Sequence, residues 1–240
     1  LAPTPGALVS LDAMAGIVGW EGDEAIVRTG TRLGALGPAL AQKGRALPNL
    51  PDINKQSLGG ALSTATHGTG AKIPAMHADV TGLRLVTPSG RVIDADEKSN
   101  PEIFQAAKVS LGALGVISQV RLRTVANRRL RRNVWLEPLD EAMAKAEARW
   151  AQHRNFEFFA VPFTGLAAGI SHDETDDPVE ARGPDQDTEL LQALRGLRNL
   201  LGFSTPLRKA AAQALMSTAK PETAVDEGWR LLSTDRPVRF

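Results

Sequence analysis

Residues 57–70 have the sequence SLGGALSTATHGTG, in which four glycines, two alanines and five hydroxyl side chains share fourteen positions. Glycine permits positive φ and lets the backbone approach a ligand or another segment closely. Exposed main-chain amides can hold anionic oxygens, and Ser and Thr add hydroxyl donors. The composition therefore fits two structures equally well, a phosphate-binding loop and a tightly packed turn. It matches neither a Walker loop, because no Gly-Lys-Ser/Thr follows, nor a dinucleotide fingerprint, because the spacing is different.

The segments before this stretch are expected to be short strands followed by one helix. Runs rich in apolar residues predict strands at residues 7–11, 16–20 and 24–28, with a turn at 21–23. Thr31 is placed to cap a helix that ends near Gly44. The core-facing residues of that helix are Leu33, Leu36, Leu40 and Ala41.

The segments after it are expected to form a hairpin, a helix and a long strand. Residues 80–86 and 91–95 predict the hairpin, which turns at Pro88-Ser89-Gly90. Asn100 is placed to cap a helix over residues 101–109, with proline at its favoured first position. Alternation over residues 115–125 predicts the long strand.

The chain changes character near residue 126, and we place a domain boundary there. A basic run at 127–133 is followed by a strand at 134–136 and a helix at 139–153. The remaining predicted segments are strands at 157–161 and 165–171, an acidic exposed loop at 172–187, and helices at 188–200 and 207–218.

Composition excludes several classes of function. The formal net charge of the 240 residues is +1, so no strong field selects nucleic acid or an anionic membrane as partner. Cysteine is absent, which excludes disulfides, thiolate catalysis and cysteine-based metal sites and fits a reducing compartment. No apolar run has the length of a membrane span, so the sequence carries no strong membrane signal.

Two segments in order resemble the vanillyl-alcohol-oxidase family, whose FAD-binding domain is of the PCMH type. The first comprises Asn49-Leu50-Pro51-Asp52-Ile53, Gln56, Leu58-Gly59-Gly60-Ala61 and residues 63–70. The second is Leu111-Gly112-Ala113-Leu114-Gly115-Val116-Ile117, with Phe104 and Ala106-Ala107 before it and a strand after it. Within that family, the sequence is most similar to aldonolactone and alditol oxidases, over about residues 7–126.

The resemblance implies an α+β fold in two domains. Residues 1–126 would be part of a PCMH-type FAD-binding domain built on a mixed sheet, and residues 127–240 the start of an antiparallel α+β substrate cap domain. The family's first FAD loop, of Gly-x-Gly-His-Ser type, would lie before Ala7 and has no counterpart in this sequence. Together with a first residue, Leu1, that is not methionine, this leads us to expect an incomplete chain.

The resemblance also implies where FAD would lie. Its pyrophosphate and ring side would be lined by Gly59, Gly60, Ser63, Thr66, His67 and Gly68, and its adenosine or flavin edge would touch Gly115 and Ile117. His67 belongs to the second FAD segment, so it does not inherit the covalent flavin link that a histidine of the first loop makes in many relatives. Ala65 stands where relatives often have glycine, so the loop must accommodate an extra methyl group.

The implied activity is that of an FAD-dependent oxidoreductase that oxidises a CH–OH group of a sugar-derived alcohol or aldonolactone. The leading hypothesis is a D-arabinono-1,4-lactone oxidase with O2 as acceptor. The alternatives are an alditol oxidase or a flavin dehydrogenase with another acceptor, and a non-catalytic FAD- or nucleotide-binding fragment. The family's catalytic acids and bases would lie beyond Phe240, so no catalytic residue is assigned. The expected location is the cytoplasm, with membrane association left open.

The remaining candidate residues have structural explanations. His77, His153 and His172 lack ligand-like spacing, which argues against a metal site. The arginines of the basic run suit a solvated edge or a strand at the domain junction better than an anion-binding surface. The aromatic residues suit a hydrophobic core better than a substrate cavity. These two groups are Arg128, Arg129, Arg131 and Arg132, and Trp135, Phe156, Phe158, Phe159 and Phe163.

Overall fold

The computed structural model describes residues 9–162, 164–180, 186–216 and 220–233. The chain divides into two compact units. Unit 1 comprises residues 1–68, 73–127 and 232–240, and unit 2 comprises residues 69–72 and 128–231. The chain therefore passes between the units four times, at 68/69, 72/73, 127/128 and 231/232.

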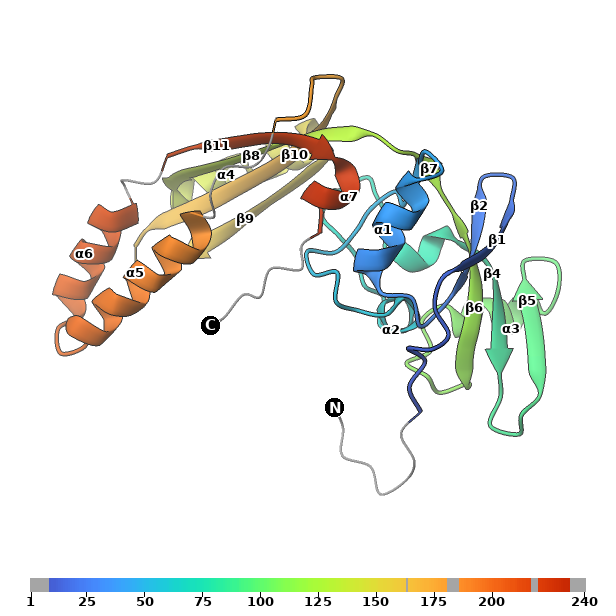
Figure 1. Cartoon of the computed structure of the whole chain (residues 1–240). Coiled ribbons are helices and arrows are strands. Elements are labelled where there is room, and N and C mark those ends of the chain that lie inside the picture. The colour runs from blue at the N-terminus through green and yellow to red at the C-terminus, as the bar shows by residue number, and fades with distance from the viewer. Residues whose placement is uncertain (1–8, 163, 181–185, 217–219, 234–240) are drawn as a thin grey trace. The chain divides into compact units, whose positions relative to one another are not determined.

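Unit 1 is built on a five-stranded sheet with the order β1-β2-β6-β4-β5 (Figure 1). The strands are β1 (Ile17–Glu21), β2 (Glu24–Arg28), β4 (Val80–Val86), β5 (Val92–Asp96) and β6 (Val116–Arg123). At the centre, Val120 of β6 pairs with Val27 on one side and with Leu83 on the other. These three side chains are at most 5% exposed, so the middle of the sheet forms the core of the unit.

The strand pairings correct one expectation. Each pairing in this sheet is antiparallel, whereas the resemblance implied a mixed sheet. Strands β2 and β4 do run in the same direction, but β6 lies between them and runs opposite to both. The α+β class itself is confirmed.

Helix α1 (Leu33–Ala41) covers the core with the residues that the sequence predicted. Leu33, Leu36 and Leu40 are at most 2% exposed, and their i, i+3, i+7 spacing puts them on one helical face. Gly44 follows the helix with a φ of +67°, a conformation in which glycine has no steric cost.

The start of α1 differs from the prediction. The N-cap is Arg32, not Thr31, and it makes no side-chain capping bond. The Thr31 hydroxyl donates to the Arg28 carbonyl at 2.6 Å and accepts the Gly16 N–H at 2.8 Å. These two bonds anchor the chain before the helix instead of capping it.

The glycine-rich stretch contains a short helix that composition did not predict. Helix α2 (Leu58–Ser63) buries Leu58, Ala61 and Leu62, which lie on one face at i, i+3 and i+4. Two consecutive glycines lower helix propensity, so burial of this apolar face decides the conformation. The other short elements of unit 1 are β3 (Arg45–Ala46), η1 (Met76–Asp79), α3 (Pro101–Ala107) and β7 (Val125–Ala126).

Unit 2 is built on a four-stranded antiparallel sheet with the order β11-β8-β10-β9 (Figure 1). Helix α4 (Leu139–Gln152) packs against β8, β9 and β10 and buries Ala142 and Ala146. The strands are β8 (Arg129–Pro138), β9 (Asn155–Val161), β10 (Leu166–Thr175) and β11 (Glu222–Glu227). The other helices of the unit are α5 (Gln186–Leu200), α6 (Thr205–Met216) and α7 (Gly228–Leu231).

An aromatic cluster fills the space between this sheet and α4. Trp135 stacks on Phe156 with ring centroids 6.1 Å apart, and Trp150 of α4 meets Phe156 edge-on. Gly169 makes room for the Trp135 ring, because a Cβ at that position would lie 2.5 Å from Cε2 of the indole. The predicted core role is confirmed for Phe156, which is 2% exposed, but Phe159 is 51% exposed and does not belong to it. Phe163 lies outside the described residues.

The basic run forms part of an inner strand rather than a solvated edge. Strand β8, which contains three of the four arginines, lies between β10 and β11. The prediction of a strand is confirmed, and the cations are matched by acids of neighbouring segments. These ion pairs are Arg128–Glu174, Arg131–Asp177 and Arg132–Glu222.

Two further predictions are wrong. Residues 9–11 of the expected first strand have no ladder partner among the residues that the structure describes, and a strand requires one. Residues 172–175 belong to β10, where they pair with β8, instead of opening the acidic loop. Residues 7–8 of that strand and 181–185 of the loop lie outside the described part of the chain.

Candidate functional site

A buried threonine holds the two glycine-rich segments together in unit 1. The Thr29 carbonyl accepts the Gly59 N–H at 2.8 Å, and the Thr29 N–H donates to the Ser118 carbonyl at 3.1 Å. The Thr29 hydroxyl donates to the Ile117 carbonyl. Thr29 is fully buried, so these three bonds are shielded from water. Thr29 thus fixes the start of α2 and the start of β6 beside each other, although they are far apart in the sequence. The sequence analysis did not identify Thr29 as a candidate residue.

A second contact joins the same segments. The Leu111 N–H donates to the Ser63 carbonyl at 3.2 Å, which links the turn before β6 to the end of α2. That turn is conformationally unusual, because Leu111 has a φ of +52° and Gly112 a φ of +79°. A leucine in the left-handed region is held there by its surroundings. Residues 59–63 and 111–117, which the resemblance placed at one site, therefore do lie side by side.

Three of the predicted glycines are explained by close contacts within the protein. A Cβ on Gly68 would lie 2.2 Å from the Leu50 carbonyl oxygen, and one on Gly115 would lie 2.3 Å from the Val86 carbonyl oxygen. A Cβ on Gly59 would lie 3.0 Å from Cβ of Thr29. Gly60 has only the Ser57 hydroxyl oxygen nearby, at 3.2 Å. The tightly packed turn thus accounts for glycine at 59, 68 and 115, and contact of these residues with FAD stays a prediction.

Ala65 occupies a left-handed conformation, with a φ of +54°. The Ala65 N–H donates to the Leu62 carbonyl at 3.1 Å, and the next N–H, of Thr66, donates to the Ala61 carbonyl at 2.9 Å. This pair of hydrogen bonds is typical of a helix that ends at a left-handed glycine. Here the left-handed residue is an alanine, whose Cβ makes that conformation less favourable. Position 65, where the resemblance led us to expect glycine, is therefore one at which the backbone geometry favours glycine.

His67 is exposed rather than enclosed in the loop. Its Nδ1 lies 3.0 Å from the Gly68 carbonyl oxygen, which can only accept, so Nδ1 carries the proton in this contact. The Nε2 atom remains available to a ligand. His67 is therefore hydrogen-bonded within its own loop while its ring is exposed, and its contact with a cofactor stays a prediction.

The segment offers neutral donors and hydroxyl groups to an anion. The Gly60 and His67 N–H groups have no hydrogen-bond partner within the described part of the chain. Thr66 shares its hydroxyl with Gln56 and Thr64, at 3.3 Å each. Beside Leu111, the Ser110 hydroxyl oxygen is buried and has no hydrogen-bond partner among the described residues. Such groups suit the pyrophosphate of a dinucleotide, because backbone amides and hydroxyls hold phosphate oxygens without a cation. The residues of unit 1 therefore fit the cofactor that the resemblance implies.

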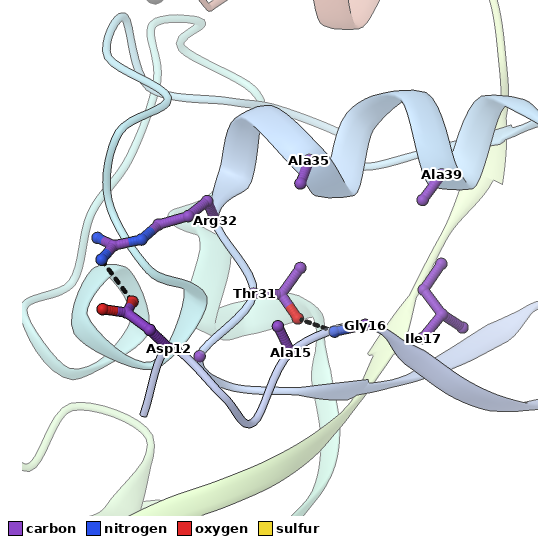
Figure 2. Close-up of a pocket in the computed structure, with 9 residues that line it drawn as sticks. Asp12, Ala15, Gly16, Ile17, Thr31, Arg32, Ala35 and Ala39 are labelled. Carbon is purple, nitrogen blue, oxygen red and sulfur yellow. Dashed lines mark hydrogen bonds and ion pairs between the residues drawn. The ribbon is translucent and has the colours of Figure 1, made fainter. Parts of the chain in front are cut away.

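A pocket of about 620 Å³ lies in unit 1 between α1 and the residues before β1 (Figure 2). Its wall includes Thr31, whose carbonyl accepts the N–H of Leu58, the first residue of α2, at 2.8 Å. Ala35 and Ala39 project from α1 toward it, and Arg32 pairs with Asp12 at its edge. Its volume lies in the range of small-molecule sites, about 300–1,000 Å³. Sequence reasoning missed it, although alanines four apart on the outer face of α1 mark where side chains leave space.

The other candidate residues do not form a second site. Within the described ranges, no group of three or more His, Asp or Glu side chains is arranged to hold a metal ion. Asp79 is 9% exposed, and burial raises the pKa of its carboxyl group, an effect opposed by the charge of Arg123. His172 is 5% exposed, and burial, with the Arg132 charge second, lowers the pKa of its imidazole to about 4. Both side chains are buried, Asp79 in unit 1 and His172 in unit 2.

Comparison with known proteins identifies relatives over most of the chain. Residues 1–96 match the family described as FAD binding domain. L-gulono-1,4-lactone dehydrogenase of Mycobacterium tuberculosis is 33% identical over 237 residues, which cover 97% of this chain and 53% of that protein. L-gulonolactone oxidase of Bos taurus is 32% identical over 180 residues, which cover 74% of this chain and 41% of that protein. The chain thus spans about half the length of the curated relatives that it matches.

Solved structures give the same fold. A variant of cholesterol oxidase from Brevibacterium sterolicum superposes with a TM-score of 0.70 at 18% identity, covering 92% of this chain and 47% of that one. At this identity the match concerns the fold alone. The predicted FAD-binding domain and its antiparallel α+β continuation are therefore confirmed as a fold.

Proposed function

We propose that the protein oxidises a CH–OH group of an aldonolactone, because the chain contains an FAD binding domain and is similar to aldonolactone oxidases and dehydrogenases. The observation that carries the proposal is the similarity to L-gulono-1,4-lactone dehydrogenase, which extends through both units to 97% of the chain. A similarity limited to residues 1–96 would support cofactor binding without indicating a substrate class.

Bound FAD would accept the hydride from the carbinol carbon. Residues of unit 1 would hold the pyrophosphate of FAD. The N–H groups of Gly60 and His67 and the hydroxyl groups of Ser63 and Thr66 would donate hydrogen bonds to it. The backbone of Gly59 and Gly68 would lie behind these donors. Gly115 and Ile117 would lie at its edge through their backbone, because the Ile117 side chain is only 6% exposed. Thr29 would position both segments through its three hydrogen bonds.

The finer proposal concerns substrate and acceptor. We propose D-arabinono-1,4-lactone as substrate and O2 as acceptor, on the strength of the sequence resemblance described above. The matched relatives include a dehydrogenase and an oxidase, so an acceptor other than O2 is the main alternative. An alditol in place of the lactone is the second alternative, and a non-catalytic FAD- or nucleotide-binding fragment the third.

A spectrum separates the cofactor proposal from the substrate proposal. The protein that contains this chain is reconstituted with FAD, and its visible absorption is recorded before and after acid precipitation. A flavin spectrum supports the cofactor assignment, and colour in the pellet indicates a covalent link. If no flavin binds even at excess FAD, the oxidoreductase proposal fails.

Turnover is then measured with D-arabinono-, L-gulono- and L-galactono-1,4-lactone and with an alditol. Oxygen uptake and dye reduction are followed in parallel. Lactone-dependent oxygen uptake supports the oxidase, and dye reduction without oxygen uptake indicates a dehydrogenase. A flavin that binds but is reduced by none of the lactones contradicts the substrate class while leaving the cofactor assignment intact.

A further inference from the structure

Residues 69–72 follow the cofactor segment, residues 59–68, and are held by the connection between α4 and β9 in unit 2. The Asn155 side chain, at the first position of β9, donates from Nδ2 to the Thr69 carbonyl. The Lys72 ammonium group donates to the Ala151 carbonyl at 3.4 Å. Both ends of this short segment are thus tied to one connection of unit 2, and a peptide bond joins its first residue to Gly68.

The orientation of the Asn155 amide is fixed by its neighbours. Asn155 is fully buried. The Arg154 guanidinium can only donate hydrogen bonds, so the Asn155 atom that it contacts is the acceptor Oδ1. The Thr69 carbonyl can only accept, so it faces the Nδ2 donor of the same amide. A reversed amide would set donor against donor and acceptor against acceptor, which is costly in a buried site.

Strand β10 supports the connection from which Asn155 projects. One carboxylate oxygen of Asp173 lies 2.7 Å from Nδ1 of His153, and the other accepts the Arg154 N–H at 3.0 Å. Strands β9 and β10 are also paired along the ladder that begins at Asn155. The donor to Thr69 therefore has a fixed support in unit 2.

The backbone before Thr69 is anchored separately within unit 1. The Thr66 N–H donates to a carbonyl of α2 at 2.9 Å, and the Thr66 carbonyl accepts the Met76 N–H at 3.1 Å. His67 and Gly68 are the two residues between these anchors and the bond at Thr69. Two residues whose flanks are both held have few backbone conformations, so their N–H groups keep nearly constant directions.

We propose that Asn155 is a positioning residue for the cofactor segment: its hydrogen bond to Thr69 holds His67 and Gly68 in the conformation that binds the pyrophosphate of FAD. The inference rests on the proposed function, because it takes residues 59–68 as the segment that holds FAD. Asn155 acts through the Thr69 backbone and not by touching the cofactor. A segment that is ordered before FAD arrives loses less conformational freedom on binding, so the affinity depends on the bond that orders it.

Two variants of Asn155 remove the donor to Thr69 in different ways. Asn155→Asp keeps the shape of the side chain and an acceptor toward Arg154, but it places an oxygen where the Thr69 carbonyl needs a donor. Asn155→Ala removes the whole amide. The matched control is Thr164→Val, which removes a buried hydroxyl group that donates to the Val161 carbonyl at 2.8 Å, at the opposite end of β9.

Hydrogen exchange tests the ordering of the segment without FAD. The protein that contains this chain is prepared free of flavin, and exchange is followed in a peptide that covers residues 64–72. We expect about tenfold faster exchange in both Asn155 variants, because one hydrogen bond that orders the segment is lost, and no change in the control. Equal exchange in the unaltered chain and the Asn155 variants overturns the proposal.

FAD affinity tests the consequence of that ordering. Urea titration first shows that each variant is folded, and the dissociation constant is then measured by quenching of flavin fluorescence. We expect about tenfold weaker binding in both Asn155 variants and an unchanged affinity in the control. An equal loss of affinity in Thr164→Val would indicate a general effect of destabilisation and overturn the positioning role.

The same titration separates this inference from the proposed function. If the unaltered chain binds no FAD, the proposed function fails and the assignment of Asn155 fails with it. If the unaltered chain and the Asn155 variants bind FAD with equal affinity, the assignment of Asn155 alone is refuted.

Discussion

At the residue scale, the glycines of the site differ in what they tolerate. Gly68→Ala would place a Cβ 2.2 Å from the Leu50 carbonyl oxygen and 2.7 Å from Oδ1 of Asn49, so the backbone must move. We expect a loss of unfolding free energy of about 3 kcal/mol. Gly60→Ala is the matched control, because its neighbour is the rotatable Ser57 hydroxyl and alanine favours the helix by about 1 kcal/mol. Urea titration of both variants measures the difference, and equal midpoints would refute the packing explanation.

Thr29 allows a test of the bond that links the two segments. In Thr29→Val the buried hydroxyl is lost and the Ile117 carbonyl loses a donor, so we expect destabilisation by about 1–3 kcal/mol. Thr29→Ser keeps the donor and removes only a methyl group, which costs about 1 kcal/mol. Thermal unfolding should therefore rank the unaltered chain first, Ser second and Val last. A serine variant no more stable than the valine variant would show that the hydroxyl does not contribute.

Residue-level patterns predicted part of the site. Ala65 was singled out because relatives often have glycine there, and its φ of +54° gives the physical reason. Thr29 could not be found in this way, because its role depends on two backbone segments that meet only in the folded chain. The pocket beside Thr31 has the same origin: it is bounded by parts of the chain whose proximity no local pattern encodes.

At the element scale, prediction succeeded where one face of an element is apolar. The leucines of α1 and the hairpin of β4 and β5 follow from spacing and turn chemistry. Strand β11 was missed because its sequence, ETAVDE, is half acidic, and its charges are accommodated only through partners such as Arg132 on β8. Helix α2 was missed because its glycines suggested a loop. Its three buried residues stabilise the helix only through tertiary contacts, which the local sequence does not reveal.

The ion pair between β8 and α4 makes a prediction about acid stability. Arg149 Nη2 lies 2.7 Å from Glu137 Oε2, and this hydrogen bond is the main reason that the pKa of Glu137 is lowered from 4.5. A lowered pKa means that the folded state favours the carboxylate, so the stabilisation is present above pH 4.5 and is lost as the pH falls through the folded pKa. We expect Glu137→Gln to lower stability at pH 7 and to flatten its decline under acid.

The exposed pair between Glu141 and Lys145 on the same helix is the control. Glu141→Gln should change stability by only about 0.5 kcal/mol and leave the acid dependence intact. Chemical denaturation between pH 7 and pH 3 compares the two variants. A Glu137→Gln chain that keeps the full acid dependence would assign that dependence to other carboxylates.

At the scale of the whole molecule, His172 makes stability depend on pH in a different window. Burial, and second the Arg132 charge, lower the imidazole pKa from 6.5 to about 4, and a hydrogen bond with the Leu231 backbone opposes this shift only in part. The unfolded chain therefore takes up a proton that the folded chain resists. Stability is complete above pH 6.5 and falls as the pH decreases to about 4, by about 3 kcal/mol in all.

His172→Leu should remove this dependence between pH 6.5 and pH 5, where carboxylates contribute little. Leucine keeps an apolar side chain in the buried site and cannot bind a proton. Urea unfolding of unaltered and variant chains at half-unit pH intervals measures the slopes. Parallel slopes would show that His172 is not the group that binds the proton.

The fourfold passage of the chain between its two units affects how the protein can be divided. A polypeptide that stops after Asn127 would carry residues 69–72, which belong to unit 2, without the Asn155 side chain that donates to the Thr69 carbonyl. The complementary piece would carry Leu232 and Ser233, which belong to unit 1. A single protease cut between the units would therefore leave each product holding a short piece of the other. Recombinant expression of either half would likewise omit a segment of one unit and include a segment of the other. We therefore expect the two units to fold from one continuous chain and not as exchangeable modules.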